Sequence, residues 1–196
     1  MDGRQIQKIL DLFIKEKKKK EKKIHYTHVE SILADQLPKK KIKNNRGVIF
    51  IVNTLTSYDP IDAFGHYVVL SIYNNTLLYF DPFNLRARFY KPYINNFLVV
   101  NSVNRQILTL GRRVQHEKTT VCGGHCLLMS FFLIKHTIPS KAMMEADKYY
   151  SRNNLNNDRK VVKFLYGLDP SLPKCQYLFC DRVQSLKQCK KKICED

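Results

Sequence analysis

The sequence predicts an α+β domain, and two observations carry that prediction. Short apolar runs rich in β-branched residues fill much of residues 47–83 between turn signals, which is typical of strands. Residues 122–136 form an apolar stretch too long for a typical strand and apolar on all sides, so we expect a buried helix opening at Cys122. Two more helix-like pieces follow around residues 141–150 and 158–166. Strands combined with one central buried helix favour the α+β class.

The N-terminal segment begins as an amphipathic helix. Residues 5–14 place apolar side chains at helical spacing on one face. The run that follows holds seven lysines broken only by Glu16 and Glu21. We therefore expect residues 1–28 to form an amphipathic helix with a Lys-rich arm, and residues 29–196 to form a single domain. A solvated charge run without a partner is the alternative interpretation of the arm.

Three strands are expected in the middle of the chain. Residues 47–53 are a continuous apolar run, typical of a strand buried on both faces. Residues 66–73 and 76–81 flank Asn74-Asn75, which is a two-residue hairpin signal because Asn tolerates positive φ. Pro82 has no backbone donor and therefore ends the second strand of the hairpin.

The charge balance is strongly basic. The chain has 34 Lys and Arg against 17 Asp and Glu, a formal net charge of +17. Such a field attracts polyanions, and nucleic acid is the commonest polyanion in a cell. We expect nucleic-acid contacts from Lys17, Lys18, Lys19 and Lys20. A general solubility role for the lysines is the alternative.

Membrane and secretory signals are weak. No apolar stretch approaches the roughly 20 residues that a membrane-spanning helix needs. The residues after Phe13-Ile14 are almost all lysine, so the apolar block of a signal peptide is missing. We expect a soluble intracellular protein in a reducing compartment, where its six cysteines need not form disulfides.

The hairpin places a base beside a carboxylate. If the turn has two residues, Tyr73 faces Thr76, and the same register makes His66 face Phe83. Asp81 then lies two residues away on the same face, and diagonal neighbours in a sheet are roughly 7–8 Å apart at the backbone. An imidazole and a carboxylate can bridge that separation.

Cys122 is the candidate nucleophile, because a thiol at a helix N-terminus near an imidazolium favours the thiolate. His66 would take the thiol proton and Asp81 would orient the imidazole ring. Gln115, on an expected loop, could supply a side-chain N–H to an oxyanion, with the Cys122 amide as the second donor. Taken singly, a buried Cys is more often a packed small hydrophobe, so the prediction depends on all four residues occurring together.

Several short motifs occur in one order between residues 29 and 136. They are Leu33-Ala34-Asp35-Gln36-Leu37-Pro38, Ile51-Val52-Asn53-Thr54, Gly65-His66-Tyr67, Tyr79-Phe80-Asp81-Pro82-Phe83-Asn84, Gln115 and Thr120-Val121-Cys122-Gly123. In this combination the chain resembles the adenovirus-type cysteine endopeptidases (adenain). Relatives of those enzymes occur in other large DNA viruses and virus-like transposons and, more distantly, among ubiquitin-like-protein proteases.

The resemblance implies a papain-like core with a mixed central sheet, in which the catalytic order is His66, Asp81, Gln115, Cys122. It implies a thiol endopeptidase, without a required cofactor, that cleaves viral structural or core precursors during virion maturation, often beside Gly. Stimulation by DNA and an activating viral peptide are also implied. The expected location is the virion and the host nucleus or cytoplasm.

Three departures from the family pattern stand out. Tyr67 replaces the usual Trp after the catalytic His, and Asp81 replaces the Glu of the adenovirus enzymes. Residues 95–114 contain no cysteine, so we do not expect an activating peptide to be linked by a disulfide in the adenoviral way.

Other candidate site residues carry weaker signals. Four tail cysteines have a symmetric spacing, but the loop between the two pairs is shorter than in most structural zinc sites, so no metal site is expected. These are Cys175, Cys180, Cys189 and Cys194. His116 and His125 could compete as the base, but neither has an obvious carboxylate partner in the sequence. Cys126 lies one helical turn after Cys122 and is expected to pack inward.

Two other functions stay open from the sequence. The same chemistry could act on host ubiquitin-like conjugates, as a deubiquitinase or deSUMOylase, which a fluorogenic ubiquitin or SUMO substrate would distinguish. A non-enzymatic interpretation retains the fold as a catalytically inactive, basic nucleic-acid-binding virion protein.

Overall fold

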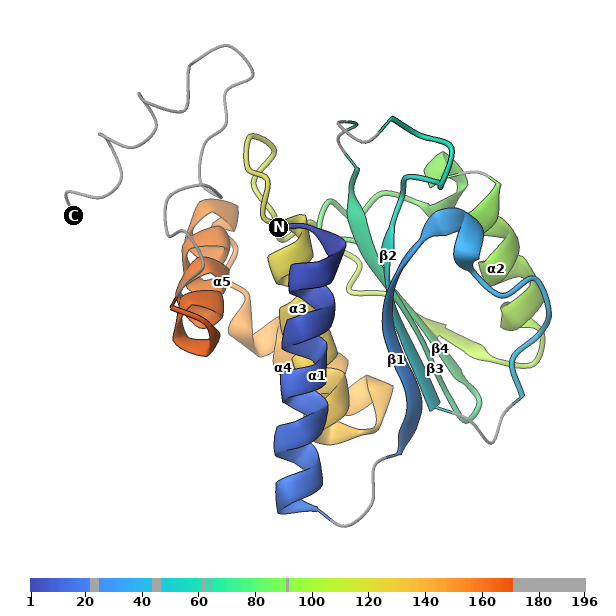
Figure 1. The fold of residues 1–196 in the computed structure, drawn as a ribbon, viewed down its shortest axis with the longest axis horizontal. Helices are drawn as coiled ribbons and strands as arrows, with labels where there is room; N and C mark the ends of the chain where they lie inside the picture. Colours follow the sequence, from blue (N-terminus) through green and yellow to red (C-terminus); the bar gives the residue numbers. More distant parts are fainter. Residues whose placement is uncertain (22–24, 44–46, 61–62, 64, 91, 171–196) are drawn as a thin grey trace.

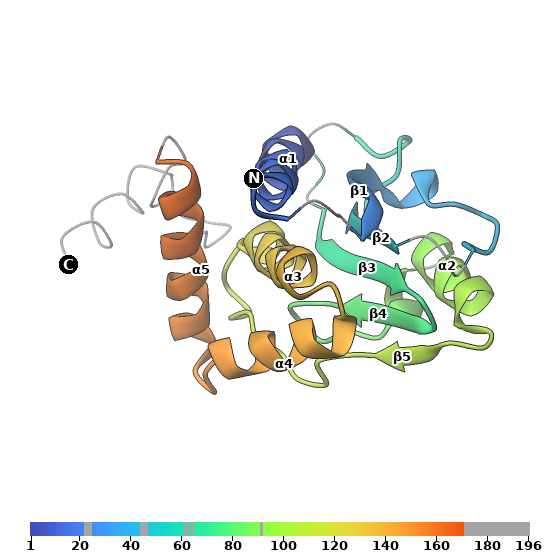
Figure 2. The same ribbon diagram turned by 90° about the horizontal axis from the view of Figure 1, so that it is seen from below.

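The computed structural model describes residues 1–21, 25–43, 47–60, 63, 65–90 and 92–170. In these residues a mixed five-stranded sheet is covered by helices on both faces, so the α+β class is confirmed (Figures 1 and 2). The helices are α1 (Gly3–Lys20), α2 (Tyr93–Ser102), α3 (Cys122–His136), α4 (Pro139–Tyr149) and α5 (Asn154–Leu168), with short 3-10 helices η1 (Ala34–Gln36) and η2 (Ala87–Tyr90).

The strands lie side by side in the order in which they occur in the chain. The outer pairs, β1 with β2 and β4 with β5, are parallel, and the two inner pairings are antiparallel. Parallel neighbours need a crossover connection, which η1 with its loop supplies on one side and α2 on the other. The strands are β1 (Tyr26–Leu33), β2 (Gly47–Asn53), β3 (Tyr67–Tyr73), β4 (Thr76–Phe80) and β5 (Gln106–Leu108).

The hairpin between β3 and β4 has the predicted turn and register. Tyr73 pairs with Thr76 and Val69 pairs with Phe80. Asn74 has a φ of 52°, the left-handed conformation that Asn adopts more readily than most residues. The predicted two-residue turn is therefore confirmed, and the register brings the residues flanking the two strands to one end of the sheet.

Alternate residues of the central strands face two separate hydrophobic clusters. Ile49 and Ile51 of β2 belong to the cluster beneath α1 and α3, whereas Val48, Phe50 and Val52 belong to the cluster beneath α2. This period of two, with apolar residues on both faces, explains why residues 47–53 read as an unbroken apolar run. The prediction of a strand buried on both faces is confirmed.

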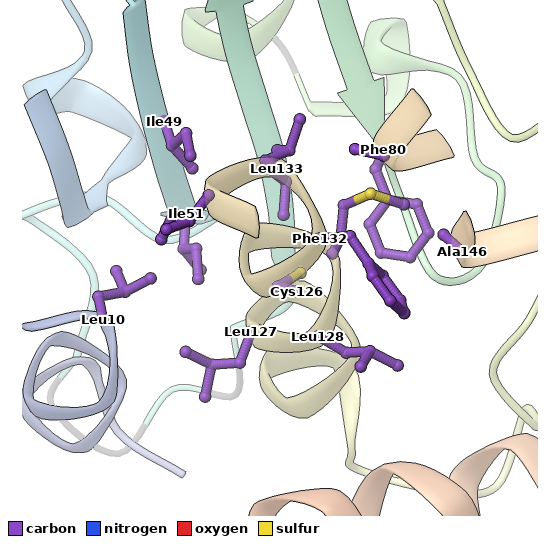
Figure 3. Packing of buried hydrophobic residues seen from close by; sticks show 14 of the residues in the cluster. Leu10, Ile49, Ile51, Phe80, Cys126, Leu127, Leu128, Phe132, Leu133 and Ala146 are labelled. Atoms are coloured by element: carbon purple, nitrogen blue, oxygen red, sulfur yellow. The ribbon is translucent and has the colours of Figure 1, made fainter. Parts of the chain in front are cut away.

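Helix α3 lies at the centre of the larger cluster (Figure 3). It begins at Cys122 and ends at His136, as predicted. Leu127, Cys126 and Leu133 are fully buried between the sheet and the neighbouring helices. The predicted inward packing of Cys126 is confirmed. Because α3 is apolar around most of its circumference, it must be enclosed on every side, and α1, α4 and α5 enclose it away from the sheet.

Helix α1 is longer than the amphipathic segment that the sequence suggested. A capping box between Asp2 and Gln5 begins it, and it continues through the lysine run to Lys20. Its apolar face packs against α3 within the larger cluster. The division at residue 28 stays a prediction, although the first half of this segment contributes directly to the domain core. No helix among the described residues is long and apolar enough to cross a membrane.

Several elements were not expected from the sequence. Strand β1, helix α2 and strand β5 have weak or short patterns, and β5 has only three residues, two of them exposed. The two helix-like pieces after α3 are present as α4 and α5. The four tail cysteines lie outside the described residues.

Candidate active site

His66 and Asp81 lie together at one end of the β3–β4 hairpin. His66 immediately precedes β3 and Asp81 immediately follows β4, so antiparallel pairing brings them to the same end of the sheet. His66 Nε2 is 2.9 Å from Asp81 Oδ1, and the Asp81 side chain is only 1% exposed. The contact expected from the hairpin register is present.

The Asp81 carboxylate is held by further donors. The Phe83 amide donates to Oδ1 at 2.8 Å, and the Tyr90 hydroxyl donates to Oδ2 at 2.8 Å. The Tyr79 hydroxyl lies 3.4 Å from the same Oδ2. Burying a carboxylate is costly unless its oxygens accept hydrogen bonds, and these bonds also fix its orientation toward His66. Tyr90 was not singled out from the sequence, because it comes from η2, outside the hairpin.

The His66 ring stacks with two aromatic rings. Phe83 stacks on it with centroids 4.9 Å apart, and Tyr90 stacks at 5.8 Å. The Arg113 guanidinium lies 5.4 Å from the centroid of Phe83. These contacts restrict rotation of the imidazole, and the face of an aromatic ring also stabilises the charged imidazolium form.

Cys122 is the half-buried first residue of α3, and its thiol lies close enough to His66 for each group to shift the pKa of the other. Burial raises the pKa of Cys122, but the His66 hydrogen bond and charge, with the amides of Tyr67 and Gly123, outweigh it and hold the pKa below its ordinary value.

The imidazole responds in the opposite direction. Burial lowers the pKa of His66, but the hydrogen bonds to Asp81 and then to Cys122 raise it by more, to about 9. A lowered thiol pKa and a raised imidazole pKa favour a thiolate–imidazolium pair around neutral pH. That pair is the reactive form of a nucleophilic cysteine.

Gln115 lies on the loop before α3, as predicted, and is fully buried. Its Nε2 donates to the Thr119 carbonyl at 2.8 Å and lies 3.3 Å from the Thr119 hydroxyl, while its Oε1 is buried without a hydrogen-bond partner. In this conformation its amide braces the loop that leads into Cys122. Its service as an oxyanion donor stays a prediction, since catalytic hydrogen bonds often form only when substrate is bound.

Comparison with known proteins gives no family. No protein-family model matches the chain, and no curated protein matches it. Among solved structures, the chain is similar to "AvrA delL154 with IP6, CoA" at 10% sequence identity, with 95% of this chain and 78% of that chain covered and a TM-score of 0.39. A likeness at this level has no bearing on the chemistry. The resemblance to adenovirus-type enzymes is not confirmed by these comparisons and stays a prediction from the motifs.

The sequence suggested that His125 lacks a carboxylate partner, and this is wrong. His125 Nε2 lies 2.7 Å from Asp158 Oδ1, and both side chains are fully buried. Burial lowers the pKa of His125 by more than Asp158 raises it, which favours a neutral ring. His125 thus belongs to a second His–Asp pair, separate from Cys122. Asp158 follows it by 33 residues on another helix, so no local pattern could reveal the pair.

The four lysines proposed to contact nucleic acid lie in the last turn of α1. The Lys17 amine bonds to the Lys135 carbonyl and to Glu21, and its side chain is only 11% exposed. Lys19 pairs with Glu16, and Lys18 and Lys20 are exposed. The structure therefore brings the four together on one helix end but directs Lys17 inward.

Within the described part of the chain, no group of three or more His, Cys, Asp or Glu side chains is arranged so that it could hold a metal ion. The candidate site consists of protein groups that move protons and stabilise charge. Such a set fits acyl transfer through a thiol.

Proposed function

We propose that this chain is a cysteine endopeptidase of a DNA virus, which cleaves viral structural or core precursors during virion maturation and is stimulated by DNA. The observation that carries the proposal is that His66 is hydrogen-bonded to the buried Asp81 carboxylate and lies close enough to Cys122 to lower the pKa of its thiol. The motif order and the basic charge support the viral substrate class and the DNA dependence.

The proposed reaction begins with the thiolate–imidazolium pair. Cys122 Sγ attacks the scissile carbonyl carbon, and the Cys122 amide with Gln115 stabilises the oxyanion. His66 donates its proton to the leaving amine as the C–N bond breaks, which leaves an acyl-enzyme thioester. His66 then takes a proton from water, the hydroxide attacks the thioester, and the released thiolate restores the pair. Asp81 keeps the imidazole oriented throughout.

Exposing a peptide library to the protein and sequencing the products by mass spectrometry tests the proposal. We expect new carboxyl termini, enriched after Gly, with the wild type, and none above background with Cys122→Ala or His66→Ala. Equal cleavage by Cys122→Ala would show that the assignment is wrong. Turnover of a fluorogenic ubiquitin substrate without library cleavage would contradict the proposed substrate class while retaining the chemistry.

A further inference from the structure

Helix α5 presents two adjacent polar residues that are fully buried and have no role in the mechanism above. They are Asn157 and Asp158, both with no exposed surface. Burying an amide and a carboxylate is costly unless their hydrogen bonds are satisfied. Their partners therefore identify what these two residues hold in place.

Asn157 holds the beginning of the loop that carries Gln115. Its Nδ2 donates to the Val114 carbonyl at 3.2 Å and to the Ser151 carbonyl at 3.0 Å. Its Oδ1 accepts from the Ser151 amide at 2.7 Å. The side chain thus ties the residue immediately before Gln115 to the turn that leads into α5.

Asp158 holds the end of the same loop and the helix of the nucleophile. Its Oδ2 accepts from the Thr119 hydroxyl at 2.8 Å and from the His116 amide at 3.1 Å. Its Oδ1 accepts from His125 Nε2 at 2.7 Å, and the other ring nitrogen faces the Tyr150 hydroxyl at 3.1 Å. One carboxylate therefore joins the loop before Cys122 to the first turn of α3.

The opposite side of the loop is bonded to the residue after Asp81. The Pro82 carbonyl accepts from the Val114 amide at 2.9 Å and from the Gln115 amide at 3.1 Å. The segment from Val114 to Thr119 is consequently fixed between the end of β4 and α5. Displacement of α5 would release one of the two supports on which the position of Gln115 depends.

We infer that Asp158, assisted by Asn157, is a positioning residue that holds the Gln115 loop and the N-terminus of α3 in register as an oxyanion site. The inference rests on the proposed function. Oxyanion donors act by preorganisation, and misplacing a catalytic group by about 1 Å can reduce a rate by about 100-fold. Asp158 touches no reacting atom, so it acts through Thr119, His116 and His125.

Two reactions of the same thiol separate positioning from general damage. Alkylation of Cys122 by iodoacetamide needs only the thiolate and forms no oxyanion. Acylation by N-benzyloxycarbonylglycine p-nitrophenyl ester does pass through an oxyanion. Sγ bonds to the acyl carbon, and the carbonyl oxygen carries the negative charge. The p-nitrophenolate then leaves with the electron pair of the broken C–O bond. Both products are quantified on the Cys122 peptide by mass spectrometry.

Two variants weaken the Asp158 support by different routes. Asp158→Asn replaces one accepting oxygen by an N–H donor. Thr119→Val leaves the His125–Asp158 pair intact and removes the hydroxyl that donates to Asp158 and also lies 3.3 Å from Gln115 Nε2. We expect each variant to slow acylation about tenfold, with alkylation within about twofold of wild type. The matched control is Asp11→Asn, which removes an exposed carboxylate charge from α1 and keeps an oxygen that can accept from Gln7, and it should change neither rate.

Each outcome decides the question. If acylation is unchanged in both variants, the inference is overturned while the proposed function stays intact. The same conclusion follows if acylation and alkylation fall in parallel, because that would report loss of the thiolate or of the fold. A wild-type protein that is alkylated at Cys122 but never acylated would overturn the proposed function and this inference together. Melting temperatures measured beside the rates confirm that each variant is folded.

Discussion

At the level of single residues, the reactivity of Cys122 depends on the protonation states of its thiol and of the His66 imidazole. The thiol pKa is lowered and the imidazole pKa is raised because each group stabilises the charged form of the other, and Asp81 stabilises the imidazolium further. Cys126, one turn away, is in the opposite situation, since burial raises its pKa well above the ordinary value. Two thiols on one helix should therefore differ strongly in reactivity.

This difference predicts two distinct pH profiles. An ordinary thiol has a pKa of about 8.5 and is mostly protonated at neutral pH, whereas Cys122, with its lowered pKa, keeps more of its thiolate as the pH falls. Iodoacetamide should therefore modify Cys122 at neutral pH while Cys126, with its raised pKa, stays unmodified. As pH rises through about 9, His66 loses its proton. Alkylation should then continue, whereas peptide cleavage should decline because the leaving amine lacks its acid.

His66→Ala provides the control for the pH dependence of alkylation. Without the imidazolium, alkylation of Cys122 should require a higher pH, near the ordinary thiol pKa. If His66→Ala is still alkylated at low pH as fast as the wild type, another group stabilises the thiolate.

At the level of elements, α3 is enclosed tightly enough that its two glycines are needed for packing. A Cβ added to Gly123 would lie 3.2 Å from Ile6 Cδ1 of α1. One added to Gly124 would lie 2.7 Å from Val161 Cγ1 and 2.8 Å from Leu165 Cδ1 of α5. The helix that carries the nucleophile is therefore in contact with helices from both ends of the described chain.

Replacing Gly124 by Ala should destabilise the protein. Ala favours a helix over Gly by about 1 kcal/mol, but overpacking against a stiff β-branched side chain costs about 1–3 kcal/mol. We expect a net loss of about 1 kcal/mol and a fall in melting temperature of about 2–4 °C, measured by thermal denaturation. Gly167→Ala on α5 is the matched control: its added Cβ meets nothing within 4 Å, so it should not destabilise. A Gly124→Ala protein as stable as Gly167→Ala would contradict the described packing of α5.

The sequence predicted elements wherever the pattern was local and strong. The β3–β4 hairpin and α3 follow from runs of neighbouring residues, and the hairpin alone brings His66 to Asp81. Strand β5 could not be predicted because three residues, two of them exposed, carry no alternation. Asp158 could not be predicted because its partners come from two other segments and meet only through tertiary packing.

At the level of the whole molecule, positive charge gathers where α1 and α3 end. Burial first, and then the charges of Lys135, Lys17 and Lys141, lower the pKa of His136, and Glu145 opposes them. The exposed Lys18 lies on the same end of α1. This cluster is remote from Cys122, which is at the opposite end of α3, so a polyanion bound here would leave the site open.

We expect duplex DNA to bind this end of the molecule with a steep dependence on salt. Replacing Lys18 and Lys20 by Ala should weaken binding and reduce the slope of log affinity against log salt by about two, because each phosphate contact contributes about 0.9. Fluorescence anisotropy at several salt concentrations measures both quantities. Replacing Lys39 and Lys40, which are exposed near η1, removes the same charge elsewhere. Equal effects from the two double variants would indicate attraction by net charge alone.

The enclosure of α3 by α1 and α5 also has a consequence for the timing of synthesis. A ribosome delivers the chain from its N-terminus, so Cys122 and His66 emerge before Asp158, Val161 and Leu165. Until α5 has folded back, α3 lacks one of its walls and the loop before it lacks one of its two supports. A nascent chain therefore carries His66, Asp81, Gln115 and Cys122 before α5 can hold them in place, so we expect the candidate site to be complete only after the last helix has packed.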